Sequence, residues 1–213
     1  MASRQSVLRE RRIFINIPFD DLYERLYIAL IAGLGGLGLI PQSVLQIPPS
    51  DNRLNRIFGL LQKCGSSIND LSRIELDRKA PRTPRFNMPF EAGLALALSL
   101  LGKSGQLRRR HRPFIFEAKK YRLLKSTSDL NGVDPCIHGG TAVGMLRALT
   151  KAFQRQGERR TVGDLLPVYH DLWGFSLHLK RANRLRDLFD GVSFRQLSQA
   201  ARKIAGRRHL LRS

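Results

Sequence analysis

Strand-like and helix-like segments alternate between residues 12 and 156, and this alternation constrains the fold more than any other feature of the sequence. Runs rich in β-branched and aromatic residues, which favour strands, lie at residues 12–17, 37–41, 66–71 and 113–118, with a shorter one at 135–138. Helical segments separate them, at residues 22–32, 52–63, 89–98 and 140–154, with a shorter turn at 121–128. Parallel strands need crossover connections, usually helices, that cover both faces of the sheet. The pattern therefore predicts an α/β fold with a doubly wound parallel sheet.

The pattern changes after residue 156, where only helical segments follow. Amphipathic spacing extends over residues 161–180 and 193–205, and Ser193 is a candidate N-cap for the second of these helices. Arginines are frequent before the first strand. We therefore expect three parts: a basic N-terminal arm (1–11), an α/β domain (12–156) and a basic, all-helical C-terminal appendage (157–213).

Composition excludes several classes of protein. The chain has 213 residues, 42% of them hydrophobic, which is enough to bury a core. Its two cysteines, Cys64 and Cys136, cannot form a disulfide framework. No apolar run reaches the roughly 20 residues of a membrane span, and no apolar signal segment follows the N-terminus. We expect a cytoplasmic protein without a membrane segment, and the sequence leaves open whether it forms a homo-oligomer.

The chain is strongly basic, with 37 Lys and Arg residues against 17 Asp and Glu and a formal net charge of +20. Such a charge attracts polyanions. The densest cluster is expected in the loop before the fourth strand and makes nucleic acid a candidate partner; it comprises Arg108, Arg109, Arg110 and Arg112. The alternative is an ordinary solvated surface, because no nucleic-acid motif or interleaved aromatic residue accompanies the cluster.

The glycines at residues 33–38 match the letters of the dinucleotide-binding fingerprint. That motif requires a strand before it and a helix after it. Here a helix precedes the glycines and a strand follows them. We therefore expect them to end the helix and to form a tight turn.

Glu91 lies at the head of an otherwise apolar helix that Pro89 opens, since proline is favoured in the first helical turn. A carboxylate at the opening of a buried helix can act as a nucleophile or can stabilise a cationic sugar. The alternative is a structural role, in which Glu91 complements the helix dipole or completes a capping box.

Polar residues also follow the first and third strands, whose carboxyl ends lie close together in a doubly wound sheet. We expect these side chains to converge with Glu91 in one crevice. Local roles are the alternative, an Asx turn for Asn16 and a turn or helix cap for Asp70. The residues concerned are Asn16, Pro18 and Asp20 after the first strand, and Asp70, Ser72 and Arg73 after the third.

Three stretches of the chain resemble a known family. They are Asn-Ile-Pro-Phe-Asp at 16–20, Ser-Ile-Asn-Asp-Leu-Ser-Arg at 67–73 and Arg-Phe-Asn-Met-Pro-Phe-Glu-Ala-Gly-Leu-Ala at 85–95. Together they resemble the nucleoside 2-deoxyribosyltransferase-like proteins, which are related in fold to TIR domains. The resemblance covers residues 12–118 and implies a flavodoxin-like, TIR-like sheet. The Asp-x-Gly-Thr-Ala-x-Glu motif of the true transferases is absent, which leaves the substrate open.

The resemblance implies an N-glycosidic-bond enzyme acting on a nucleoside or nucleotide, NAD included, of the glycohydrolase or ribosyltransferase type. Glu91 would attack the anomeric carbon or stabilise its cationic transition state. Asp70 would bind a ribose hydroxyl or handle the proton of the leaving base. Asn16 and Asn87 would position the sugar, and Arg73 or Arg85 would meet a phosphate. The expected substrate-binding set is Asn16, Pro18, Asp20, Ser72, Arg73, Arg85 and Asn87.

The sequence is also compatible with other functions. The same fold can host a non-catalytic module that senses a nucleotide or recruits a partner, for instance in a bacterial defence system. Cys136 and His138 alone do not make a zinc site, so no metal and no cofactor are expected. A later polar cluster could complete the pocket or could form local turns; it comprises Lys125, Asp129, Asp134 and His138.

Overall fold

The computed structural model describes residues 4–47, 52–73, 86–104, 110–123, 130, 133–154 and 160–211. Strands and helices alternate up to residue 152, and two long helices follow. The elements are α1 (Arg4–Arg11), β1 (Arg12–Asn16), α2 (Glu24–Gly36), β2 (Ile40–Ser43), the 3-10 turn η1 (Val44–Gln46), α3 (Arg53–Gln62), β3 (Ser66–Asp70), α4 (Asn87–Lys103), β4 (Arg112–Glu117), β5 (Cys136–Ile137), α6 (Ala142–Ala152), α7 (Val162–Asn183) and α8 (Gly191–Arg207).

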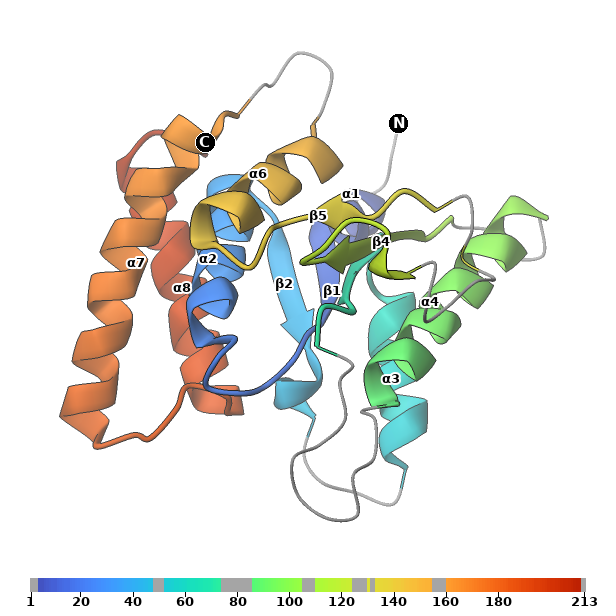
Figure 1. Cartoon of the computed structure of the whole chain (residues 1–213), viewed down its shortest axis with the longest axis horizontal. Helices are drawn as coiled ribbons and strands as arrows, with labels where there is room; N and C mark the ends of the chain where they lie inside the picture. Colours follow the sequence, from blue (N-terminus) through green and yellow to red (C-terminus); the bar gives the residue numbers. More distant parts are fainter. Residues whose placement is uncertain are drawn as a thin grey trace.

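The five strands form one all-parallel sheet in the order β2-β1-β3-β4-β5 (Figure 1). The prediction of a flavodoxin-like, doubly wound α/β fold is confirmed. β2 and β3 pair with opposite edges of β1, so the strand order reverses there. Asn16 and Asn69 are register partners, which brings the carboxyl ends of β1 and β3 level with each other. Open α/β sheets bind ligands at such a reversal, outside the carboxyl ends of the strands.

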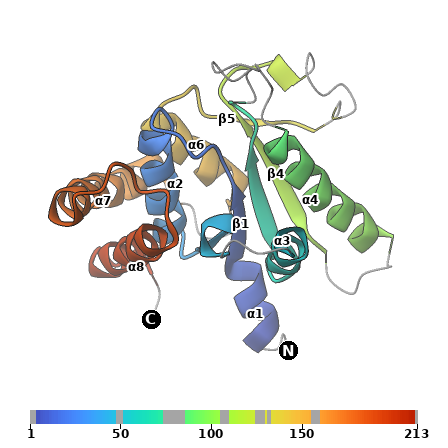
Figure 2. The ribbon, with the colours of Figure 1, turned by 90° about the horizontal axis from the view of Figure 1, so that it is seen from below.

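Helices cover both faces of the sheet (Figure 2). Successive side chains of a strand point to opposite faces. Accordingly, Ile13 and Ile15 of β1 pack in the larger core with α2 and α6, whereas Phe14 packs with α3 and α4 on the other face. The two terminal helices, α7 and α8, pack against α2 and form a further layer outside it.

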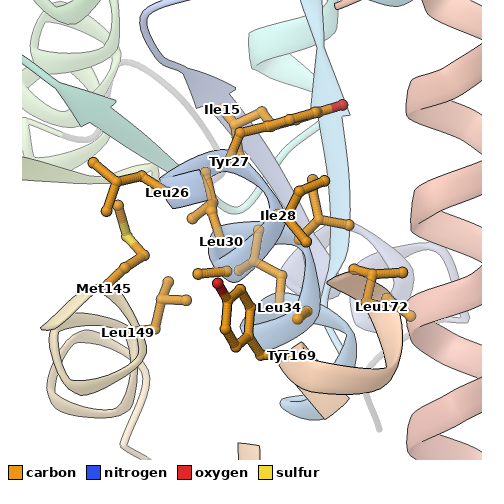
Figure 3. Close-up of a cluster of buried hydrophobic side chains, with 14 of the residues drawn as sticks. Ile15, Leu26, Tyr27, Ile28, Leu30, Leu34, Met145, Leu149, Tyr169 and Leu172 are labelled. Carbon is orange, nitrogen blue, oxygen red and sulfur yellow. The ribbon is translucent and has the colours of Figure 1, made fainter. Parts of the chain in front are cut away.

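α2 is the centre of the larger core, and all its residues from Leu26 to Gly36 are buried. Figure 3 shows Leu26, Leu30 and Leu34 of α2 among side chains of the sheet, of α6 and of α7. The labelled neighbours are Ile15, Met145, Leu149, Tyr169 and Leu172. A helix that is apolar around its whole circumference is stable only when it is surrounded in this way.

The prediction that the glycines of residues 33–38 end the helix and form a turn is wrong for all of them except Gly38. α2 continues through Gly36, and β2 begins only at Ile40 instead of residue 37. Only Gly38, with φ of 69°, takes the left-handed conformation that a turn at this place requires.

The other glycines of this segment allow neighbouring helices to pack closely against α2. A Cβ atom at Gly35 would lie 2.7 Å from the Cβ of Ala201 in α8, which is too close for two carbon atoms. Cβ atoms at Gly33 and Gly36 would likewise collide with Leu149 of α6 and Leu165 of α7. The low helix propensity of glycine is therefore overridden by the contacts that three neighbouring helices make.

The basic arm of residues 1–11 contains α1, and Arg9 of this helix donates hydrogen bonds to the carbonyls of Gln62 and Arg110, both at 3.2 Å. One further expectation needs correction. The cap of α8 is Asp190 instead of Ser193; its carboxylate accepts from the amides of residues 192 and 193. The expected boundary at residues 156 and 157 lies outside the described residues.

Within the described ranges, no helix is long and apolar enough to cross a membrane.

Candidate functional site

A pocket of about 870 Å³ lies at the carboxyl end of β1, next to the reversal of strand order. α3 and α4, which lie side by side on this face of the sheet, contribute their first turns to its wall (Figure 1). The lining residues are Asn16, Ile17, Pro18, Phe19, Val44, Arg53, Leu54, Ile57, Phe86, Asn87, Met88, Phe90 and Glu91.

Asn16 connects the end of β1 to the head of α4. Its side-chain amide donates to the carbonyl of Met88 at 2.8 Å and lies 3.4 Å from Oδ1 of Asn69. Both amide protons are thereby used, and none of the described residues donates to the carbonyl oxygen of Asn16, which can accept from a ligand. The contact with Met88 places the first turn of α4, and with it Glu91, at the pocket.

A buried polar row, made of His111, Ser67, Asn69 and Asn16, orients the amide of Asn16. His111 lies 3.1 Å from the carbonyl of Cys64 and 3.0 Å from the Ser67 hydroxyl, to which Asn69 donates at 3.0 Å. Burial, assisted by nearby arginines, lowers the pKa of His111 to about 4, so the ring is neutral at neutral pH. Its Nδ1 then donates to the carbonyl and its Nε2 accepts from Ser67, which fixes the direction of every bond in the row.

Glu91 is the one carboxylate among the described residues that line the pocket. Burial raises its pKa to about 7, and the charge of Arg53, which lines the same pocket, opposes this shift. Among the described residues, none donates a hydrogen bond to the Glu91 carboxylate. The group is therefore close to half-ionised at neutral pH, a condition suited to acid–base or nucleophilic chemistry.

Asp70 is fully buried and belongs to a different cluster. Its Oδ2 accepts from the Tyr23 hydroxyl and its Oδ1 accepts from the amide of Ser72 at 2.9 Å. His138 Nε2 lies 3.2 Å from Oδ2, an ion-pair distance, although the direction does not meet hydrogen-bond geometry. The amide of Gly140 donates to His138 Nδ1, so a neutral ring carries its proton on the side of Asp70. We refer to Tyr23, Asp70, Ser72 and His138 as the Asp70 network.

The two acids of the Asp70 network titrate away from neutral pH. Burial alone would raise the pKa of Asp70, but the contacts with His138, Ser72 and Tyr23 outweigh it and hold this pKa below its ordinary value. Burial and the charge of Asp70 raise the pKa of Tyr23 well above its ordinary value. Asp70 is thus ionised at neutral pH and Tyr23 remains a donor to it.

The expected convergence of site residues is only partial. Four of them line the pocket: Asn16, Pro18, Asn87 and Glu91. Asp70 and Ser72 lie in the buried network and do not line it. Asp20 and Arg73 pair with each other, with Arg73 Nε 2.9 Å from Asp20 Oδ2. Arg85, Lys125 and Asp129 lie outside the described residues, and Asp134 is exposed.

Sequence reasoning missed Arg53 and Tyr23. Arg53 opens the helix after β2, at the carboxyl edge of the sheet, and this position was the signal that could have identified it. Tyr23 gave no such signal, because a tyrosine in an apolar segment is ordinarily a core residue.

The basic cluster lies at the other end of the sheet. Arg112 is the first residue of β4, with Nη2 3.9 Å from Oε2 of Glu10, and Arg110 beside it is exposed. Arg108 and Arg109 lie outside the described residues. In the described ranges, no three His, Cys, Asp or Glu side chains form a group that could hold a metal ion.

Comparison with known proteins finds no match: no family model, no curated protein and no solved structure corresponds to this chain. Fold and pocket geometry therefore carry the functional argument.

Proposed function

We propose that this protein cleaves the N-glycosidic bond of a nucleoside or nucleotide, with Glu91 acting at the anomeric carbon. The observation that carries the proposal is the position of Glu91, the one carboxylate among the described lining residues, in a pocket at the carboxyl edge of a parallel sheet, where burial raises its pKa to about 7. The family resemblance of residues 12–118 supports the same assignment.

The proposed reaction is a displacement at the sugar. The Glu91 carboxylate forms a bond to C1′ while the bond from C1′ to the base nitrogen breaks, and the base leaves with the electron pair and takes a proton from water. Water then hydrolyses the glycosyl ester, or a second base replaces the first. Hydrolase and transferase differ only in this last step.

The poor solvation of Glu91 favours such a reaction. A carboxylate without hydrogen-bond donors gains most from a neighbouring positive charge, and the sugar becomes cationic only in the transition state. Asn16 offers an acceptor to a ribose hydroxyl, since both its amide protons are committed within the protein. Asn87, on the next wall of the pocket, is a second polar contact for the sugar.

The proposal gives Asp70 a supporting role. Its carboxylate is surrounded by protein donors and does not line the pocket, so we assign to it the positioning of Tyr23 and His138 beside the strand ends. Direct contact with a ribose hydroxyl or with the leaving base remains a prediction from the resemblance.

The test is incubation with a panel of nucleosides, nucleotides and NAD, followed by chromatography of the released base. We expect release by the wild type and by Glu10→Gln, a control at the opposite end of the sheet, and none by Glu91→Gln. Turnover by folded Glu91→Gln at the wild-type rate would refute the role of Glu91. Binding by the wild type without release of base from any panel member would instead assign the pocket to nucleotide sensing.

A further inference from the structure

We infer that the pocket selects a nucleoside 5′-monophosphate, with Arg53 binding the phosphate and Phe86 and Phe90 packing against the base. This inference rests on the proposed function, because it takes the same pocket and names the class of substrate. It differs from the sequence-based expectation, which assigned the phosphate to Arg73 or Arg85.

The cationic wall of the pocket is formed by Arg53. It is the only Lys or Arg among the described lining residues, and it is the first residue of α3. Its Nη1 has one weak contact, at 3.5 Å from the carbonyl of Ile47, and none of the described carboxylates forms an ion pair with it. A guanidinium without an ion-pair partner can bind phosphate with two parallel hydrogen bonds.

Arg73 is less suited to that task. Its guanidinium is already paired with Asp20 at 2.9 Å, and Arg73 does not line the pocket. Binding a phosphate there would first require the loss of an existing charge-assisted hydrogen bond. The distribution of partners therefore favours Arg53 over Arg73.

The apolar wall of the pocket exposes unusually large side chains. Phe86 is 68% exposed and Phe90 is 54% exposed, and they are four residues apart at the start of α4. Residues at this spacing lie on one side of a helix. Leu54, 50% exposed, extends the apolar surface from α3. A nucleobase of any kind can stack on an aromatic side chain, because every base has a planar π-face.

The pocket lining also includes polar groups, beside the cationic and the apolar ones. Glu91 and Asn16 offer a carboxylate and an acceptor suited to a sugar, and Arg53 is near enough to Glu91 for its charge to act on that carboxylate. A nucleoside monophosphate carries a base and a phosphate on one ribose. It therefore needs one apolar wall, one cationic wall and a polar centre. A free nucleoside leaves the cation unused.

The experiment compares adenosine with adenosine 5′-monophosphate, and also with NAD, on the full chain by calorimetric titration and by base release. We expect the wild type to favour the monophosphate over the nucleoside by roughly 10–100-fold, the usual worth of charge-assisted hydrogen bonds. Arg53→Gln should abolish this preference by weakening the binding of the monophosphate. Arg56→Gln is the matched control, since Arg56 is exposed on the same helix and does not line the pocket.

Two further readouts separate a direct contact from a structural effect. Phe86→Ala and Phe90→Ala should weaken nucleoside and monophosphate alike, by roughly 10-fold. Arg53→Gln should also shift the pH at which base release becomes half-maximal upward, because it removes the charge that opposes the protonation of Glu91.

The outcomes distinguish this inference from the proposed function. Equal affinity of the wild type for adenosine and its monophosphate would overturn the inference, even if base release proceeds. Loss of the preference in Arg56→Gln but not in Arg53→Gln would also overturn it. A monophosphate preference that depends on Arg53, in a protein that releases no base, would support the binding assignment and refute the catalytic one.

Discussion

The Asp70 network and the Glu91 pocket lie at the same edge of one sheet, yet they place their carboxylates under opposite conditions. Asp70 is fully buried, but protein groups donate to both of its oxygens and its pKa is lowered. Glu91 is less buried, but it lacks donors among the described residues, and its pKa rises to about 7. Burial therefore does not determine the charge of a carboxylate by itself; the donors around it decide the outcome. Of the two acids, only Glu91 is accessible and close to a change of protonation at neutral pH.

The largest expected effect is on activity. Glu91→Gln should reduce base release by roughly 10³-fold or more, because it removes the group that acts on the developing sugar cation. Asp70→Asn should reduce release less, since an amide keeps part of the hydrogen bonding. Initial rates on folded protein, checked by circular dichroism, measure both. The roles of the two acids are reversed if the Asp70 variant proves the more damaged.

The free energy of unfolding should show the reverse order, with Asp70→Asn the more damaging of the two substitutions. Asp70→Asn should lower the free energy of unfolding by about 2–4 kcal/mol, because it removes a charge that three buried partners are arranged to meet. Glu91→Gln should not lower it at pH 7, because burial disfavours the ionised carboxylate that the neutral amide replaces. Urea unfolding of the three proteins measures the difference. Equal destabilisation by both substitutions would show that the network and the pocket do not differ as described.

The two carboxylates should also give opposite pH dependence of stability. The folded pKa of Asp70 is lowered, so its stabilisation is present above its ordinary pKa of 3.8 and is lost as the pH falls through the folded value. The folded pKa of Glu91 is raised, so its contribution is fully present below its ordinary pKa of 4.5 and is lost as the pH rises to about 7.

Urea unfolding at pH 4.5 and pH 8 tests the second of these effects. Between pH 4.5 and pH 8 the free energy of unfolding of the wild type should fall by about 1–3 kcal/mol relative to that of Glu91→Gln, after allowance for solvent screening. Base release by the wild type should rise with pH up to about 7, since the nucleophile must be ionised. A rate that falls over this range would identify Glu91 as a proton donor instead.

The smallest effect is expected for the ion pair beside the pocket. Arg73→Gln should lower the free energy of unfolding by less than about 1 kcal/mol, because the ion pair of Arg73 with Asp20 is partly exposed. It should leave the ratio of monophosphate to nucleoside turnover unchanged, unlike Arg53→Gln. A ratio that falls on loss of Arg73 would restore the original assignment of that arginine to phosphate binding.

The sequence predicted the sheet well, because strand and helix periodicity is a local property. It also brought Asn16 and Glu91 together, since the rule that strand ends form the ligand site needs only the order of elements. The Asp70 network was not predictable in this way. Tyr23 and His138 reach Asp70 from elements 47 and 68 residues away in sequence, and only packing decides such contacts. The glycines of residues 33–36 were misassigned for the same reason, because their propensity favours a turn whereas their neighbours require a helix.

The glycines of α2 have a consequence for how the chain folds. Gly33, Gly35 and Gly36 fit against α6, α7 and α8, which follow α2 in the chain only after most of the sheet strands. During synthesis, the apolar surface of α2 is therefore fully covered only after α8 has left the ribosome. Contacts over such long sequence separations slow folding and prolong the exposure of apolar surface. We expect nascent chains that end before α8 to depend on chaperones, whereas chains that include α8 should bury α2 cooperatively.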